Sequence, residues 1–187
     1  MIRESGLNFA ALPESEFDEP LGESTGASAL FGSTGGVIEA VARTACEWMG
    51  SAHPQIEFEQ LRGMQGLRRA SVNIGGEERL IGIASGLGNA RALLEEILNG
   101  ESEYTAIEIM ACPGGCIAGG GQPYHHNNHE AAKKRQQGLY SEDKRMKSRR
   151  SHENSAVLRI YEEFLGEPYS EAAHKLLHTH FEKKQRI

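Results

Sequence analysis

Hydrophobic residues recur along this chain with two different periods. Spacings of three and four residues predict amphipathic helices over four ranges: 37–49, 89–98, 154–165 and 170–181. Shorter hydrophobic runs predict β-strands at 56–59, 70–74, 80–84 and 104–110. Two glycines, at 75 and 76, separate the second run from the third, which predicts a β-hairpin.

The ends of these segments indicate how the chain is organised. Ser33 or Thr34 can cap the first helix, and Ser170 can cap the last one. Strands and helices alternate in the first part of the chain, whereas the second part is basic and then helical. We therefore expect an α/β lobe over residues 1–123, followed by a basic linker and a helical tail over 124–187.

The composition places the chain among folded proteins without a membrane span. Of its 187 residues, 39% are hydrophobic and 25% are charged, which permits a packed core and excludes wholesale disorder. No apolar run approaches the ~20 residues that a membrane-spanning helix needs. The first residues do not read as a secretory leader, so we expect a cytoplasmic location.

The charge of the chain is unevenly distributed. The net charge is −6, yet the segment 133–150 contains eight basic residues and two acidic ones. A nucleic-acid interface would explain this segment, but no aromatic residues interleave with its charges except Tyr140, and the chain as a whole is acidic. We expect instead an arm that wraps an acidic surface, and no binding of nucleic acid.

The clearest chemical signal is a glycine-rich cysteine motif at residues 108–123. Cys112 and Cys116 are four residues apart, directly after a predicted strand, so their thiols can point to one side. Pro113 suits the first position of a helix, whose N-terminus would stabilise thiolates. The surrounding glycines let a bulky group approach the backbone, and thiolate ligands favour zinc or iron–sulfur clusters. The alternative is a tight turn with two buried thiols.

Two cysteines do not complete such a site, because structural zinc sites and cubane clusters need four ligands. The third cysteine, Cys46, lies in the first helix, where we expect a buried and inert thiol. No metal is assigned to the histidines, which are His125, His126 and His129 after the motif and His174 and His178 in the last helix. The missing ligands must come from another chain or from another part of the same protein.

The motif from Met110 to Pro123, Met-Ala-Cys-Pro-Gly-Gly-Cys-Ile-Ala-Gly-Gly-Gly-Gln-Pro, resembles the last cysteine motif of the iron-only (di-iron) hydrogenases. Other stretches resemble the same family in the same order. Upstream of the motif they are 17–22, 26–27, 30–40 and 86–91; those that match the small-subunit region are 139–143, 150–154 and 174–180. The resemblance covers nearly the whole chain.

The resemblance implies both a fold and a site. The chain looks like the C-terminal half of a two-lobed catalytic domain, one lobe having a small, mainly parallel sheet flanked by helices. Cys112 and Cys116 would be two of four ligands of a 4Fe-4S cluster, and Cys116 would also bridge to a di-iron unit with carbonyl and cyanide ligands. Met110 would pack beside the carbonyls, and Phe31 and Gly32 would line the same pocket.

The activity that this resemblance implies is the reversible interconversion of dihydrogen with protons and electrons. The two earlier cysteine motifs of the family are absent, so a partner chain would carry the remaining cluster cysteines and the electron-transfer iron–sulfur clusters. The alternative is a non-catalytic relative that assembles iron–sulfur clusters or acts as a sensor. The stretches 31–36 and 150–154 favour the hydrogenases over that alternative.

Overall fold

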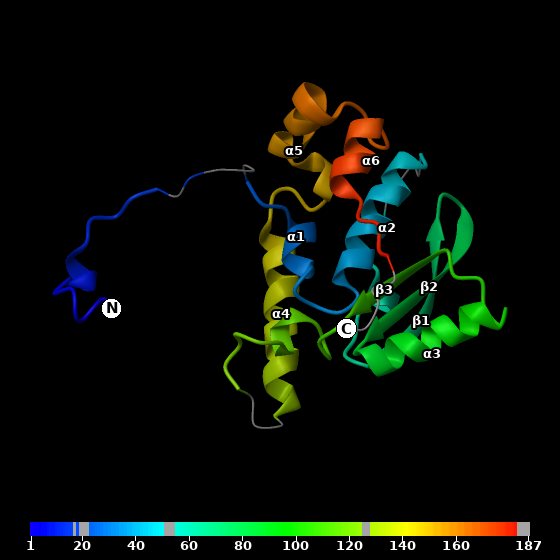
Figure 1. Ribbon diagram of the computed structural model, residues 1–187, viewed down its shortest axis with the longest axis horizontal. Coiled ribbons are helices and arrows are strands. Elements are labelled where there is room, and N and C mark those ends of the chain that lie inside the picture. Colours follow the sequence, from blue (N-terminus) through cyan, green and yellow to red (C-terminus); the bar gives the residue numbers. More distant parts are fainter. Residues whose placement is uncertain (17, 19–22, 51–54, 125–127, 183–187) are drawn as a thin grey trace.

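A small β-sheet covered by a helix on each face forms the centre of the molecule. The computed structural model describes residues 1–16, 18, 23–50, 55–124 and 128–182. The helices and strands follow in the order α1 (Gly26–Leu30), α2 (Gly36–Trp48), β1 (Leu67–Ile74), β2 (Glu77–Ser85), α3 (Leu87–Leu98), β3 (Ala106–Met110), α4 (His129–Arg145), α5 (Ser155–Ile160) and α6 (Glu171–Leu177). Figure 1 shows α4 beside α1, away from the sheet, with α5 and α6 at one end.

The sheet has three strands in the order β1-β2-β3. Strands β1 and β2 form the predicted antiparallel hairpin, whose turn uses Gly75 and Gly76 at φ of 65° and 88°. Strand β3 pairs with β2 in parallel, since α3 carries the chain across between them. The sheet is therefore mixed rather than mainly parallel, because a two-glycine turn can only reverse the chain.

The two faces of the sheet follow the alternation of side chains along its strands. Ile81 and Ile83 of β2 point toward α2 and pack with Ile38 and Ala42 of that helix. The next residue, Ala84, packs with Ala90 and Leu93 of α3 on the opposite face. The helices predicted over 37–49 and 89–98 are thus confirmed as the two layers that enclose the sheet.

The strand predicted at 56–59 is absent from its described residues. Residues 55–58 have no regular structure, and a single 3-10 turn follows at Glu59–Leu61. Phe58 and Leu61 are both completely buried against α2 and the sheet. Their spacing of three residues suits a 3-10 turn, which places such side chains on one side. This hydrophobic run therefore fills the core without pairing.

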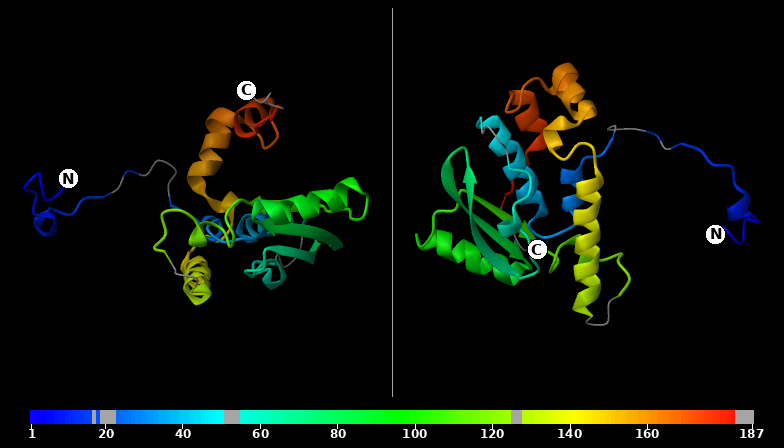
Figure 2. Two further views of the ribbon diagram at one scale, coloured as in Figure 1. Left: turned by 60° about the horizontal axis from the view of Figure 1, so that its bottom comes forward. Right: turned by 180° about the vertical axis from the view of Figure 1, so that it is seen from behind.

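The segment predicted as a basic linker is largely the 17-residue helix α4. Figure 2 shows from two further sides that α4 runs alongside α1. Beyond it, the first predicted tail helix is shared between α5 and a π-helical turn, Tyr161–Leu165. The last predicted helix ends at Leu177, and Ser170 caps it as expected, accepting a hydrogen bond from the Ala173 amide at 3.1 Å.

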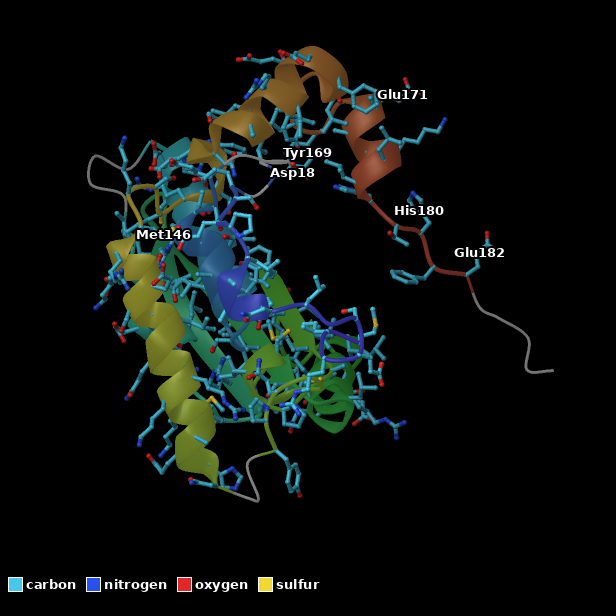
Figure 3. The ribbon with its side chains drawn as sticks, turned by 90° about the vertical axis from the view of Figure 1, so that its left-hand side faces the viewer. Asp18, Met146, Tyr169, Glu171, His180 and Glu182 are labelled. Carbon is cyan, nitrogen blue, oxygen red and sulfur yellow. The ribbon has the colours of Figure 1, made fainter. Side chains whose placement is uncertain are left out.

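The two ends of the described chain lie outside this arrangement. Residues 1–16 are exposed throughout and contain a single 3-10 turn, Phe9–Ala11. At the other end, Figure 3 shows that His180 and Glu182 follow α6 on an extended segment.

None of the helices among the described residues has the length and hydrophobicity needed to cross a bilayer.

A buried cluster of charges joins α4 to α2. Arg43 is fully buried and donates hydrogen bonds to both carboxylate oxygens of Asp143, at 2.7 and 2.9 Å, and to Glu39 at 2.8 Å. Arg149 binds the same Asp143 at 2.6 Å and Glu57 at 3.1 Å. In this cluster, Arg149, together with Lys144 at 3.3 Å from Glu57, joins a base of the basic segment to an acid outside it. The buried centre of the cluster is the reverse pair, an acid of the segment with a base of α2.

Breaking this cluster should cost much of the stability of the protein. Asp143→Ala leaves Arg43 buried without its bidentate partner, so we expect the free energy of unfolding at neutral pH to fall by about 3–5 kcal/mol. Urea denaturation measures this loss. The matched control is Glu142→Ala, which removes an exposed carboxylate one residue away and should change stability by less than about 0.5 kcal/mol. Equal effects of the two substitutions would contradict the assigned role.

The same carboxylate gives a dependence on pH. Burial raises the pKa of Asp143, but the hydrogen bonds from Arg43 and Arg149 outweigh burial and hold the pKa below its usual value. The stabilisation is therefore complete above the ordinary aspartate pKa of about 3.9, and it disappears as the pH falls through the lower pKa of the folded state. Asp143→Ala should accordingly lose less stability than the parent protein on acidification.

Candidate metal centre

Strand β3 leads directly into the cysteine loop. After Met110 the chain turns, and a 3-10 helix of one turn, Cys116–Ala118, follows. Pro113 lies in the turn and does not begin an α-helix, so the predicted helix N-terminus at the cysteines is wrong. The Gly115 amide donates a hydrogen bond to the Cys112 carbonyl at 3.0 Å and closes the turn between the two cysteines.

Both cysteines of this loop are exposed. The alternative interpretation of the motif, a tight turn with two buried thiols, is therefore excluded. A glycine near them limits crowding, because a Cβ atom at Gly119 would lie 3.2 Å from the Cys112 sulfur. The loop thus exposes two thiols, and the absence of a side chain at Gly119 leaves space beside the Cys112 sulfur.

A second glycine-rich loop, residues 31–36, lies directly against the cysteine loop. The Thr34 amide donates to the Gly114 carbonyl, and the Ile117 amide donates to the Gly32 carbonyl, both at 3.1 Å. Gly115 has a φ of 92°, and a Cβ there would lie 2.8 Å from the Gly32 oxygen. The structure therefore brings together two stretches about 80 residues apart that sequence analysis had assigned to one pocket.

The other predicted site residues take different positions around these loops. Met110 is half-buried at the end of β3, and its carbonyl accepts a hydrogen bond from the Gly86 amide at 2.8 Å. The Phe31 side chain is 46% exposed and lines an apolar groove of about 260 Å³ with Val41 and Tyr169. Gly32 thus meets the cysteine loop through its backbone, while Phe31 faces a separate groove.

Cys46 lies apart from the cysteine loop, as expected. It is buried in α2, donates a hydrogen bond to the Asn73 carbonyl at 3.6 Å, and has a thiol pKa raised by burial. The rings of His174, in α6, and His178, directly after it, pack against each other with centroids 4.5 Å apart. Within the described ranges, no cluster of three or more histidines, cysteines or acids is arranged to hold a metal ion.

His129 is the first residue of α4 and lines a cavity beside the cysteine loop. The cavity has a volume of about 430 Å³ and is also lined by Lys133 of α4 and by Pro113 and Gly114. The other two histidines of that stretch, His125 and His126, lie outside the described residues.

Three residues that shape these loops were not predicted from the sequence. Glu108 of β3 accepts hydrogen bonds from the amides of Gly35 at 2.6 Å and Ile38 at 2.9 Å, so it caps α2 in place of the predicted Ser33 or Thr34. In the sequence, the only indication of this role is that Glu108 is a charged residue within an otherwise apolar strand. The cap residue itself is Gly35, with a φ of 90°.

The other two missed residues are Gln136 of α4 and Arg68 of β1. Gln136 donates to the Ser33 hydroxyl at 2.7 Å, and Arg68 donates to the Thr34 carbonyl at 3.1 Å. Burial lowers the pKa of Arg68, while the charge of Glu108 acts in the opposite direction. Both side chains are buried, and both hold the 31–36 loop by hydrogen bonds.

Comparison with known proteins decides the family. Residues 1–120 match the family model "Iron only hydrogenase large subunit, C-terminal domain", and residues 121–184 match "Iron hydrogenase small subunit". The chain belongs to the iron-only hydrogenase family. It corresponds to the C-terminal region of these hydrogenases, and the small mixed sheet with its helices is part of their α/β fold.

Individual relatives agree with this assignment. The NADP-reducing hydrogenase subunit HndD of Solidesulfovibrio fructosivorans is 53% identical over the full chain, which spans 32% of that subunit. A variant of the FeFe-hydrogenase HydA1 from Chlamydomonas reinhardtii superimposes with a TM-score of 0.68 at 38% identity, covering 96% of this chain and 52% of that one. Protein NAR1 of Arabidopsis thaliana is 29% identical over 97% of this chain, which spans 40% of it.

The contact between the two loops of this hydrogenase chain can be tested by adding one methyl group. Gly115→Ala forces a side chain into left-handed backbone and against the Gly32 oxygen, so we expect the free energy of unfolding to fall by about 3 kcal/mol. Gly120→Ala is the control, since nothing lies within 4 Å of a Cβ there. Urea denaturation of both variants is the measurement, and a Gly115→Ala protein as stable as the control would disprove the close approach.

Proposed function

We propose that this chain supplies two cysteine ligands and one wall of the cluster site in an iron-only hydrogenase. The enzyme would interconvert dihydrogen with protons and electrons. The observation that carries the proposal is the contact between the exposed cysteine loop and the 31–36 loop, in a chain that belongs to the hydrogenase family. The chain spans about a third of the hydrogenase subunit that it matches, so the activity is proposed for the larger assembly.

The proposed cofactor is a 4Fe-4S cluster bridged to a di-iron unit with carbonyl and cyanide ligands. The residues present would supply two of the four cysteine ligands of the 4Fe-4S cluster. Such a cluster takes thiolate ligands, and Cys112 and Cys116 expose two thiols on one short loop. The 3.2 Å between the Cys112 sulfur and a Cβ at Gly119 means that a side chain there would crowd the ligand. The cluster would supply the electron transfer and the activation of hydrogen.

Each residue of the proposed site has a separate task. Cys112 would bind the cubane, and Cys116 would bind the cubane and bridge to the di-iron unit. Met110 and Gly32 would line the pocket and keep water from it, since apolar surroundings protect such a centre and tune it. Phe31 would join them only if its side chain left the groove that it lines with Val41 and Tyr169. The backbone of Gly32 is already held against the cysteine loop by the Ile117 amide.

The remaining ligands would come from a partner chain that also carries the electron-transfer clusters, or from another part of the same protein. The surface of this chain suits such an assembly, because α2 and the edge strand β3 border an apolar groove of about 370 Å³ that includes Val41, Met49 and Ala106. Val41 and Met49 are exposed there.

Three further expectations stay predictions. They are the division of the chain at residue 123, the cytoplasmic location and the hetero-oligomeric state.

The second candidate function is a non-catalytic role in iron–sulfur assembly or sensing. It is favoured by the relationship to protein NAR1, which spans nearly the whole chain. The identity of 29% to that protein is well below the 53% to the hydrogenase subunit, which supports the catalytic proposal instead. Infrared bands of carbonyl and cyanide ligands in the loaded assembly would distinguish the two functions, since only the hydrogenase needs a di-iron unit.

The first test of this proposal uses the chain by itself. Two thiolates do not saturate a cubane, so anaerobic reconstitution of the isolated chain should give less than one cluster per chain, iron that is lost on gel filtration, and no hydrogen turnover. Adding a hydrogenase segment with the two missing cysteine motifs should raise the bound iron, and supplying the di-iron unit with its carbonyl and cyanide ligands should then give turnover. Cys46→Ala is the control and should change neither result. A stable, active cluster in the lone chain would refute the shared site.

The second test compares the two proposed ligands. In the reconstituted assembly, Cys116→Ala should abolish the carbonyl and cyanide infrared bands, because Cys116 would hold both the cubane and the di-iron unit. Cys112→Ala removes one of four cubane ligands, so its bands should be weaker but present. Bands of full intensity in Cys116→Ala would contradict the assignment of the bridge.

A further inference from the structure

Glu108 is a buried carboxylate that connects the two loops of the proposed site. It is 7% exposed, and its two oxygens accept hydrogen bonds from the Gly35 and Ile38 amides at 2.6 and 2.9 Å. These amides belong to the first turn of α2, which continues from the 31–36 loop. Glu108 itself lies on β3, four residues before Cys112. One side chain thus ties the start of the helix to the strand that carries the cysteines.

Such a cap could not come from the helix itself. Gly35 occupies the cap position with a φ of 90°, and a Cβ there would lie 2.1 Å from the Leu61 carbonyl oxygen. No side chain fits at that position, so the free amides of the first turn need an acceptor from elsewhere. A carboxylate is the strongest acceptor for them, because it also meets the positive end of the helix dipole.

The connection is short and stiff on both sides. Strand β3 is held by its parallel pairing with β2 and by the hydrogen bond from the Gly86 amide to the Met110 carbonyl at 2.8 Å. On the other side, Arg68 donates to the Thr34 carbonyl at 3.1 Å, next to the residue that Glu108 binds. A displacement of the Glu108 carboxylate would therefore move the 31–36 loop relative to the cysteine loop.

We infer that Glu108 is a positioning residue of the cluster site: its carboxylate holds the 31–36 loop, and with it the backbone of Gly32, at a fixed place relative to Cys112 and Cys116. The presence of a cluster in the pocket rests on the proposed function. The coupling of the 31–36 loop to the cysteine loop does not depend on that function. The inference predicts that weakening the Glu108 cap loosens hydrogen bonds that Glu108 itself does not make.

The experiment measures amide hydrogen exchange by NMR in the 187-residue chain without iron. The reporters are the amides of Thr34 and Ile117, which join the loops, and the amide of Ile81 in the central strand serves as the reference. In Glu108→Gln, one acceptor and the charge are lost while the shape is kept. We expect the protection of both reporters to fall about tenfold or more beyond any change at Ile81.

The control variant is matched for general loss of stability. Val72→Ala removes two methyl groups from a completely buried side chain of β1, away from both loops. It should lower protection at Thr34, Ile117 and Ile81 together, without the selective loss. If Glu108→Gln also changes all three amides equally, the carboxylate is a general stabilising group and the inference is wrong.

A milder substitution covers the case in which Glu108→Gln does not fold. Glu108→Asp keeps the charge but withdraws the carboxylate by about 1.5 Å, one carbon–carbon bond, so it can reach one amide at most. Its selective loss of protection at Thr34 and Ile117 should be present but smaller. Unchanged protection at both amides in a folded Glu108→Asp chain would overturn the inference.

A spectroscopic measurement then connects the coupling to the site. In the assembly reconstituted with its partner segment, the carbonyl bands of Glu108→Gln should shift or broaden, while those of Val72→Ala should match the parent. Selective loss of protection without any carbonyl bands in the parent assembly would refute the proposed function alone. Carbonyl bands that are unchanged in Glu108→Gln would refute the positioning role.

Discussion

The contact between two glycine-rich backbones is the constraint on which the rest of this structure depends. Gly114 and Gly115 lie so close to Gly32 and Thr34 that the two main chains exchange hydrogen bonds directly, with no side chain between them. A Cβ at Gly115 would lie 2.8 Å from the Gly32 oxygen, and the left-handed φ of 92° there requires glycine independently. Gly115 is therefore the position at which this contact depends on glycine.

Two backbone hydrogen bonds between the loops would not by themselves hold a site in place. The 31–36 loop is fixed from three further directions, by Glu108 of β3, by Arg68 of β1 and by Gln136 of α4. Helix α4 is in turn held by the fully buried pair of Arg43 and Asp143. Buried charges are costly unless paired, so this pair fixes α4 against α2 and neither partner can be removed without leaving the other uncompensated.

This arrangement leaves the functional groups at the surface. Cys112 and Cys116 are exposed, and apolar side chains of α2 line open grooves on the same chain. An isolated domain normally covers surfaces of this kind, and relatives of this hydrogenase chain are about two to three times longer. These exposed groups are consistent with the proposed role of the chain as one wall of a cluster site.

Local patterns in the sequence determined most of the elements. The hairpin at Gly75 and Gly76, the amphipathic helices α2 and α3, and the paired cysteines after β3 all follow from short-range spacing, which depends on neighbouring residues alone. The family motifs also indicated that the 31–36 loop and the cysteine loop belong to one pocket. These features need no knowledge of which segments meet in space.

The tertiary structure decided what distant residues do for one another. The pattern around Phe58 is the same whether the side chain fills a core or belongs to a strand, and only the packing under α2 excludes the strand. The capping of α2 by Glu108 and the pairing of Arg43 with Asp143 join residues 70 and 100 positions apart. Hydrophobic periodicity in a single sequence reports only on residues that are close along the chain. Contacts between distant residues depend on the path of the folded chain, so no periodicity reveals them.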